Sequence, residues 1–338
     1  MSTEIRWGVL STAKIARSAV IPAMHAASNG RVVAVASRDA ERARRFARAN
    51  DVPRHHGSYE ELIVSPDIDA VYIPLPNTLH AEWTIRAAEH GKHVLCEKPL
   101  ALSVAECESM HRAAEANGVR LMEAFMYRFH PRTEKAIAMA HSGGLGEVRL
   151  IRSAFTFRLR LPEDVRFDPA LGGGGLWDVG CYCVNISRTM ARSEPVEVRA
   201  WASWSDRGVD TMLSGIMHFA NGIVAHFDCS LDLERREFYD VGGTESSITI
   251  ETGFSPGSGD VSIVEHRAKR QEVRHDVRGV DQYRLMVEHF ADCVLHNRPP
   301  RYGAGEAAAN VAAIDALYRS AKDAGRPVTP VSPQFHSR

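Results

Sequence analysis

The first third of the chain alternates short apolar segments with helical ones. Repeated strand–helix units of about 25–35 residues predict a parallel, doubly wound sheet with right-handed crossovers. Such a sheet binds ligands beyond the carboxyl ends of its strands, so the residues that follow each strand are the first candidates for a site. The expected strands lie at 5–10, 31–36, 69–75, 92–96 and 119–123.

The remainder of the chain predicts a different architecture, built on an antiparallel sheet. Asn221-Gly222 is a strong hairpin turn between two strand-like runs. Two amphipathic helices, at about 282–297 and 304–324, close the chain. The expected strands lie at 148–157, 196–205, 211–219, 223–231, 248–251 and, more weakly, in a pair around 261–275.

Together these patterns predict an α/β chain of two domains. Residues 1–122 form an N-terminal Rossmann domain with a doubly wound parallel sheet. Residues 123–338 form a C-terminal α+β domain with a large, mainly antiparallel open sheet, whose last helix can pack back on the first domain.

Charge and composition exclude several classes of partner. The chain has 41 basic and 42 acidic residues, and this balance offers no electrostatic case for nucleic acid or an anionic membrane. No apolar run approaches the roughly 20 residues that span a bilayer, and the charged start of the chain leads us to expect no secretory signal. The six cysteines show no zinc spacing, so we expect reduced thiols, no metal and a cytoplasmic protein.

The turn after the first strand has small residues where a dinucleotide needs them. It reads Gly8-Val9-Leu10-Ser11-Thr12-Ala13-Lys14-Ile15-Ala16, with Ser11, Ala13 and Ala16 at the small positions. Small residues let the backbone approach a pyrophosphate, and the following helix points N–H groups at its charge. An ordinary strand–turn–helix also explains the segment, because the expected glycines are absent, but its place at the start of a βαβ unit favours cofactor binding.

The second strand ends in Ser37 and Arg38, where NAD-binding sites usually place an acid. A hydroxyl and a guanidinium suit a 2′-phosphate, and the guanidinium can also lie flat on adenine. Asp39 follows directly, and Arg38 could be one surface arginine among many in this region. We predict NADP as the cofactor in preference to NAD.

Three further motifs together resemble a known family. Cys96-Glu97-Lys98-Pro99-Leu100 resembles the Glu-Lys-Pro signature of the Gfo/Idh/MocA oxidoreductases. Leu75-Pro76-Asn77-Thr78-Leu79-His80 looks like that family's Pro-Asn-x-x-His turn. The segment from Gly173 to Tyr182 looks like its glycine-rich Asp-x-Gly-x-His/Tyr helix entry, and the tail 303–330 also resembles the family's end. The resemblance covers nearly the whole chain, in the family's order.

Within the family, residues 123–131 and Tyr182 look like the NADP-dependent pyranose, aldose and dihydrodiol dehydrogenases and the glucose–fructose oxidoreductases. Inositol dehydrogenases usually have histidine where this chain has Tyr182, so inositol is not the expected substrate. The resemblance implies hydride transfer between NADP and a hydroxyl or carbonyl carbon of a carbohydrate-like aldose, pyranose or anhydrosugar. A trans-1,2-dihydrodiol dehydrogenase and a non-catalytic dinucleotide-binding sensor are the alternatives.

The resemblance also implies that Lys98 is catalytic and that Asp178 and Tyr182 face it. Oxidising an alcohol releases a proton as well as a hydride, and Lys98 or Tyr182 could accept it, although each has an ordinary pKa near 10. Lys98 could instead stay protonated and polarise the substrate oxygen. Asp178 and Tyr182 are four residues apart and share a helix face. A helix-dipole acid and a core aromatic are their structural alternatives.

Other residues are assigned to the cofactor on the same resemblance. Glu97 contacts a ribose or orders the Lys98 turn, which the resemblance implies contains a cis Lys98–Pro99 bond. Asn77 and His80 line the nicotinamide side, unless His80 is only a polar residue at a helix start. Arg128 reaches cofactor or substrate, unless it forms an interdomain ion pair. The complete set of expected cofactor contacts is Ser11, Thr12, Ala13, Lys14, Ile15, Ser37, Arg38, Leu75, Pro76, Asn77, His80, Glu97, Lys98 and Arg128.

The antiparallel sheet also predicts an assembly. Sheets with one open face often pair in two-fold dimers. Trp201, Trp204, Met217 and Phe219 lie on the strands that would supply such a face. We expect a homodimer, with a homotetramer as the alternative.

Overall fold

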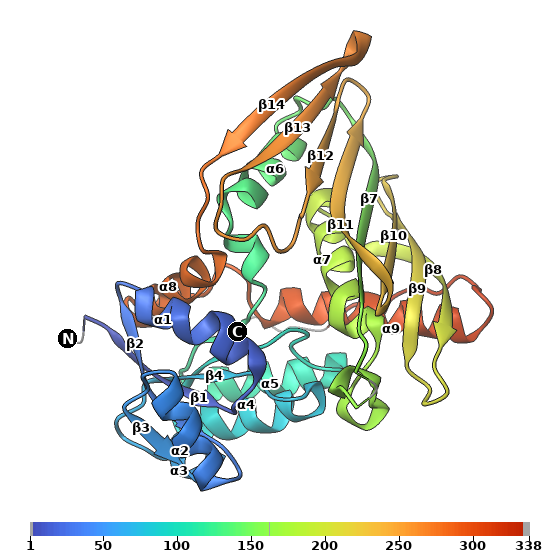
Figure 1. Ribbon diagram of the computed structural model, residues 1–338. Coiled ribbons are helices and arrows are strands. Elements are labelled where there is room, and N and C mark those ends of the chain that lie inside the picture. Colours follow the sequence, from blue (N-terminus) through green and yellow to red (C-terminus); the bar gives the residue numbers. More distant parts are fainter. Residues whose placement is uncertain (1–2, 162, 334–338) are drawn as a thin grey trace. The chain divides into compact units, whose positions relative to one another are not determined.

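The computed structural model describes residues 3–161 and 163–333, and the chain divides into two compact units (Figure 1). Unit 1 holds the described residues up to Met126 together with Asp281–Ala308. Unit 2 holds Tyr127–Val280 and Ala309–Pro333. The chain therefore crosses between the units more than once, and the expected domain boundary at 122/123 stays a prediction.

Unit 1 contains the predicted parallel sheet. Its six strands lie in the order β3-β2-β1-β4-β5-β6, and every pair is parallel. The order reverses between β1 and β4, which is the switch point where doubly wound sheets open a crevice at their carboxyl ends. The strands are β1 (Ile5–Leu10), β2 (Gly30–Ala36), β3 (Arg54–His56), β4 (Ala70–Ile73), β5 (His93–Cys96) and β6 (Leu121–Glu123).

Capping residues fix where several helices of unit 1 begin. Asp39 accepts a hydrogen bond from the Arg42 amide at 2.9 Å, and Ser103 forms a complete capping box with Glu106. The first crossover begins with a π-helical turn, Ala16–Val20. The helices are α1 (Ile21–Ala26), α2 (Ala40–Ala49), α3 (Tyr59–Ile63), α4 (His80–Glu89) and α5 (Val104–Ala116).

One helix from the end of the chain belongs to unit 1. This is α8 (Gln282–Leu295), which packs against α1 and β1. The rings of Trp7 and Phe290 lie 5.5 Å apart, and the Ser28 amide donates to the Glu288 carboxylate at 3.1 Å. The amphipathic pattern of this helix was visible in the sequence, but the unit that covers its apolar face was not.

Unit 2 is built on an eight-stranded sheet in the order β14-β13-β12-β11-β7-β10-β9-β8. Only β7 and β10 pair in parallel, and the other pairs are antiparallel, as the predicted fold class requires. The strands are β7 (Val148–Arg158), β8 (Pro195–Trp204), β9 (Asp210–Phe219), β10 (Val224–Ser230), β11 (Asp232–Gly243), β12 (Ser247–Glu251), β13 (Val261–Arg267) and β14 (Gln271–Val277).

Helices cover one face of this sheet. Helix α7 (Cys181–Ala191) packs against β7, β10 and β11, and it follows a π-helical turn, Leu176–Gly180. Helix α9 (Ala304–Lys322) reaches β8, where the Ala200 amide donates to the Ser320 hydroxyl at 3.0 Å. The remaining helical segments are α6 (Pro131–His141) and 3₁₀ turns at Asn77–Leu79, Met126–Phe129, Val165–Phe167, Pro169–Leu171 and Ala268–Arg270.

All six cysteines are free and buried. Among the described residues, no helix is long and apolar enough to cross a membrane. Nor do residues 3–161 and 163–333 bring together three His, Cys, Asp or Glu side chains in a way that could hold a metal ion.

Candidate functional site

The predicted cofactor residues of unit 1 gather where its parallel strands end. Ser11 follows β1, Ser37 follows β2 and Glu97 follows β5. Because β1, β2, β4 and β5 are parallel neighbours in the sheet, these positions share its carboxyl edge. The turn Leu75-Pro76-Asn77 follows β4 at the same edge.

Ser11 adopts the backbone conformation that the missing glycine would have supplied. Its φ is +139°, whereas Ala13 keeps a negative φ. The Ser11 hydroxyl donates to the Pro74 carbonyl at 3.1 Å and accepts from the Ala13 amide at 3.0 Å. A serine thus holds the tight turn and also ties the end of β1 to the end of β4.

Asp39 is occupied as a helix cap, which leaves Ser37 and Arg38 as the polar pair after β2. Ser37 is 6% exposed, and its hydroxyl lies 3.4 Å from the Asp39 amide. The Arg38 side chain is exposed and interacts with the hydroxyl of Tyr59; burial raises the pKa of Tyr59, which Arg38 opposes. The Tyr59 ring packs edge-on against Trp83 at 5.0 Å.

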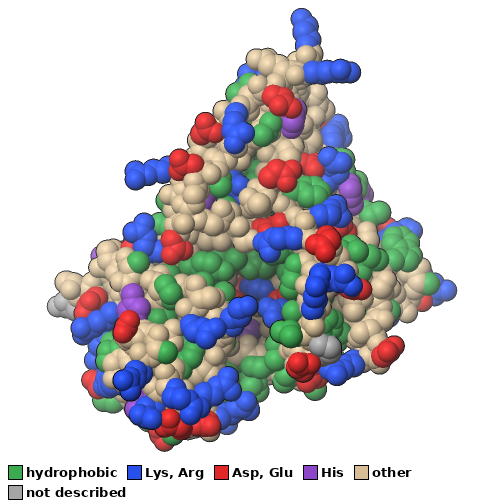
Figure 2. Space-filling view, in the orientation of Figure 1, with side chains coloured by type: hydrophobic (Ala, Val, Ile, Leu, Met, Phe, Trp, Pro, Cys, Tyr) green, Lys and Arg blue, Asp and Glu red, His purple; other side chains and the backbone are tan. Residues whose placement is uncertain are grey.

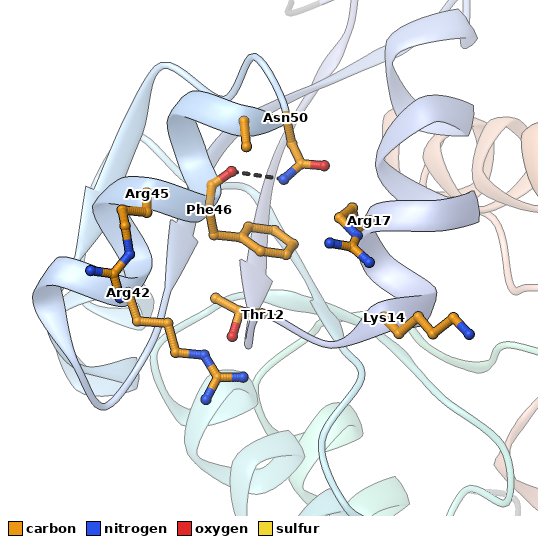
Figure 3. A pocket seen from close by; sticks show the side chains of 8 residues that line it. Thr12, Lys14, Arg17, Arg42, Arg45, Phe46 and Asn50 are labelled. Atoms are coloured by element: carbon orange, nitrogen blue, oxygen red, sulfur yellow. Dashed lines mark hydrogen bonds between the residues drawn. The ribbon is translucent and has the colours of Figure 1, made fainter. Parts of the chain in front are cut away.

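A hollow of about 490 Å³ lies between the first turn and α2 (Figure 3). Phe46 and Ala49 form its apolar part, and the Asn50 amide donates to the Phe46 carbonyl at 2.7 Å. Figure 2 shows that Lys and Arg side chains gather over α2. The sequence indicated Thr12 and Lys14 as cofactor contacts, but it did not indicate which arginines of α2 would lie beside them. Four cationic side chains line the hollow: Lys14, Arg17, Arg42 and Arg45.

The turn that carries Lys98 is fixed by its neighbours on both sides. The Glu97 carboxylate accepts from the hydroxyl of buried Tyr72 at 2.5 Å and from the Lys98 amide at 3.2 Å. The Leu100 amide donates to the Glu123 carboxylate of β6 at 2.7 Å. The Lys98–Pro99 bond is cis, as the resemblance implied.

His80 joins this turn to the preceding one. It is fully buried, with Nδ1 2.8 Å from the Pro99 carbonyl and Nε2 2.9 Å from the Leu75 carbonyl. Burial lowers the pKa of His80 even though two carbonyl partners favour the protonated ring. Its position at the start of α4 therefore serves to lock the Leu75 and Pro99 turns together.

In unit 2, Asp178 lies in the π-helical turn and forms an ion pair that the sequence did not reveal. The Arg166 Nε donates to the Asp178 carboxylate at 2.6 Å, and Asp164 accepts from the same guanidinium at 3.1 Å. The Asp178 carboxylate raises the pKa of Arg166. Arg166 lies in a 3₁₀ turn with no periodic pattern, so nothing in the sequence singled it out.

The glycine-rich loop folds back onto the same segment. The Gly174 amide donates to the Arg166 carbonyl at 2.9 Å. A Cβ at Gly173 would lie 2.5 Å from that carbonyl oxygen, which explains why glycine is needed at 173.

Tyr182, the second residue of α7, is 4% exposed and packs in an aromatic cluster within unit 2. Its ring lies 5.7 Å from Tyr127 and 5.4 Å from both Phe155 and Phe254. The Tyr127 hydroxyl donates to Asn185 at 2.6 Å. Arg128, also in unit 2, is 6% exposed. Lys98 belongs to unit 1, whereas Asp178 and Tyr182 belong to unit 2.

Comparison with known proteins decides the family. Residues 5–125 match a model described as an oxidoreductase family with an NAD-binding Rossmann fold, and residues 133–249 match the GFO/IDH/MocA C-terminal domain. D-xylose 1-dehydrogenase (NADP(+)) 2 of Haloferax volcanii is 39% identical over 94% of this chain and 97% of its own length. The chain belongs to the Gfo/Idh/MocA oxidoreductase family.

Other members of the Gfo/Idh/MocA family resemble the chain over most of its length. Trans-1,2-dihydrobenzene-1,2-diol dehydrogenase of Xenopus tropicalis is 31% identical over 86% of this chain and 89% of its own. KijD10, a 3-ketoreductase from Actinomadura kijaniata solved with NADP and TDP-benzene, has a TM-score of 0.89 and 29% identity over 94% of this chain and 98% of its own. The prediction of an oxidoreductase is confirmed. The prediction of an NADP cofactor is also confirmed, because NADP is named for two of these relatives.

Proposed function

We propose that the protein is an NADP-dependent dehydrogenase that transfers a hydride between the nicotinamide and a hydroxyl or carbonyl carbon of a sugar-like substrate, an aldose, pyranose or anhydrosugar. The observation that carries this proposal is the similarity to a D-xylose 1-dehydrogenase across nearly the full length of both chains. The similarity to an aldose-aldose oxidoreductase from Caulobacter crescentus, with a TM-score of 0.89 and 28% identity, supports the same substrate class.

The residues at the carboxyl edge of unit 1 fit NADP by the chemistry of their donors. Ser37 and Arg38 offer a hydroxyl and a guanidinium where an NAD enzyme offers a carboxylate. Asp39, which could have replaced that carboxylate, caps α2 instead. The cationic hollow lined by Lys14, Arg17, Arg42 and Arg45 adds positive charge between the first turn and α2.

When bound, the nicotinamide supplies the hydride acceptor, and the chain must then handle the proton. We assign this proton to Lys98 and Tyr182, with one acting as base and the other as the group that polarises the reacting oxygen. KijD10 was also solved with a lysine replaced by alanine and with a tyrosine replaced by phenylalanine. Those two positions are separated by as many residues as Lys98 and Tyr182, which supports the pairing.

The turn around Lys98 is suited to hold an amine in one place. Glu97 accepts from the Lys98 amide, Glu123 accepts from the Leu100 amide, and His80 bonds to the Pro99 carbonyl. Asp178 is held by Arg166, so its carboxylate has a fixed direction. We assign Asp178 a role in binding the substrate or orienting Tyr182.

The proposal is tested by following reduced nicotinamide with NADP⁺ and a panel of aldoses, anhydrosugars and diols. We expect turnover with pentoses or hexoses. Lys98→Met should reduce kcat by at least about 10²-fold while the Kd for NADP⁺ stays within about twofold, because the amine acts on the proton rather than on cofactor binding.

Lys269→Met, in an exposed hairpin turn, is the matched control and should behave as the unaltered protein. Full activity of Lys98→Met would remove the mechanism. Turnover restricted to dihydrodiols would favour the second candidate, a trans-1,2-dihydrodiol dehydrogenase. Two observations support that second candidate: the aromatic cluster around Tyr182 and the similarity of the chain to such enzymes.

A further inference from the structure

A buried carboxyl group contacts the glycine-rich loop of unit 2. Asp210, the first residue of β9, is 1% exposed. One oxygen accepts from the Tyr318 hydroxyl of α9 at 2.6 Å, and the other accepts from the Leu176 amide at 2.7 Å. The Gly175 backbone also donates to this carboxylate. Asp210 stands in no motif that pointed to the function, and Tyr318 lies in the tail 303–330 without having been assigned a role.

The loop is shaped to fit this carboxyl group. Gly174 has φ +129°, and a Cβ there would lie 2.3 Å from a carboxylate oxygen of Asp210 and 2.7 Å from the Tyr318 hydroxyl. Glycine is thus required at 174 both by its backbone conformation and by the close approach of the Asp210–Tyr318 pair.

The bonded amide belongs to the element that carries the site residues of unit 2. Leu176 begins the π-helical turn that holds Asp178 and runs directly into α7, which holds Tyr182. The first amides of a helix lack partners within it. No side chain at the N-cap, Gly175, supplies one, so Asp210 does so from a distant strand.

Asp210 is the group of this cluster that changes charge near neutral pH. Burial raises the pKa of Asp210 to about 6, against the hydrogen bonds that it accepts. Tyr318 on α9 and Cys229 on β10 face it, and burial raises the pKa of both well above their ordinary values, so both stay neutral. The Lys322 ammonium lies 6.0 Å from the centre of the Tyr318 ring.

We propose that Asp210 is a positioning residue for the reaction: its ionised carboxylate, steadied by Tyr318, holds the start of the helical segment that presents Asp178 and Tyr182. Once protonated, the carboxyl group has one oxygen that must donate to the Tyr318 oxygen, and its other oxygen accepts from the loop amides without a full negative charge. The hydrogen bonds that hold the loop are then neutral and weaker than those of the carboxylate. The link to turnover rests on the roles proposed above for Asp178 and Tyr182.

Activity measurements on the Asp210→Asn and Tyr318→Phe variants of the full chain test whether Asp210 affects turnover. We expect kcat of the unaltered enzyme to fall as pH drops through about 6. Asp210→Asn should lower kcat at pH 8 by at least about 10-fold, with the Kd for NADP⁺ within twofold, and should lack that fall. Tyr318→Phe keeps the carboxyl group but loses a donor, so the fall should move to higher pH.

A spectroscopic readout tests the loop independently of the substrate. Trp177 lies in the same turn, with its ring 5.7 Å from Tyr318, so its fluorescence should step at about pH 6. The step should vanish in Asp210→Asn and in Trp177→Phe, and it should move to higher pH in Tyr318→Phe. If the protein were inactive on every sugar, the proposed function would be wrong. The fluorescence step would still show whether the ionisation of Asp210 changes the conformation of the loop.

Thermal unfolding separates positioning from loss of fold. A buried acid with a raised pKa destabilises the folded chain when ionised, so Asp210→Asn should melt no lower than the unaltered protein at pH 8. Unchanged kcat and an unchanged pH profile in a folded Asp210→Asn variant would overturn the proposal. So would a fluorescence step that persists in that variant.

Discussion

At the scale of single residues, Ser11 has a strained backbone whose cost is offset by the hydrogen bonds of its hydroxyl group. Its φ of +139° lies where side chains are disfavoured, at a cost on the order of 1–3 kcal/mol. Its two hydrogen bonds, to Pro74 and Ala13, offset about 1 kcal/mol each. Ser11→Ala keeps the strain and loses both bonds, so we expect a loss of about 2 kcal/mol in the free energy of unfolding.

Ser11→Gly is the matched variant, because it loses the same bonds but relieves the backbone. We expect it to stay within about 1 kcal/mol of the unaltered protein in urea unfolding. If Ser11→Ala proved as stable as Ser11→Gly, the backbone at this position would not be strained.

The sequence could indicate those site residues that directly follow a strand. Ser11, Ser37 and Glu97 each follow an apolar run, and the sheet order brings them to one edge. Arg166 and Asp210 could not be found in this way. Arg166 meets Asp178 because an irregular loop folds back, and Asp210 meets Leu176 across a separation of 34 residues.

At the scale of elements, the π-helical turn before α7 depends on a close approach to β10. A Cβ at Gly180 would lie 2.7 Å from the Cys229 sulfur and 2.7 Å from a Leu176 methyl carbon. Gly180→Ala should therefore overpack this contact and lower the free energy of unfolding by about 1–3 kcal/mol. Urea unfolding measures the loss.

The double variant Gly180→Ala/Cys229→Ala provides the control, because it removes the sulfur that the new methyl group would strike. We expect it to recover part of the loss, so that the two changes are not additive. Strict additivity would show that the close approach to Cys229 does not constrain the turn.

Local patterns predicted the elements unevenly. The helix caps at Asp39 and Ser103 each involve a residue three positions along the chain, so a local pattern is enough to indicate them. Strand β11 (Asp232–Gly243) was not predicted, although it pairs with β7 and β12 inside the sheet. Its first half, which contains Glu234-Arg235-Arg236, is exposed on successive residues, so it lacks the alternation that marks a strand.

At the scale of the whole molecule, the sheet of unit 2 has a face that its helices leave uncovered. Residues opposite one another across the central strands are exposed or half-buried, and their neighbours along each strand are buried. The exposed cross-strand row is Arg199, Ile216, His226 and Arg152, and it ends at Asp240 on β11, which is buried. Trp201 is 52% exposed and Ile216 43% exposed beside paired charges, a mixture typical of an interface.

We propose that this face pairs with its copy in a two-fold homodimer. In such an interface each substitution occurs twice and meets its own copy near the axis. Ile216→Arg and Trp201→Arg place new positive charges on the face, so we expect sedimentation to change from a dimer to a monomer at micromolar protein. A tetramer reduced to dimers would show that the face is one of two interfaces.

Val64→Arg is the control, because Val64 in unit 1 is 57% exposed and lies outside the sheet of unit 2. It should leave sedimentation unchanged. A monomer in the unaltered protein, or a dimer that survives both substitutions, would contradict the assignment. Because the substitutions lie on the face of the sheet opposite α7, any loss of activity that accompanies dissociation would show that assembly supports the helix that carries Tyr182.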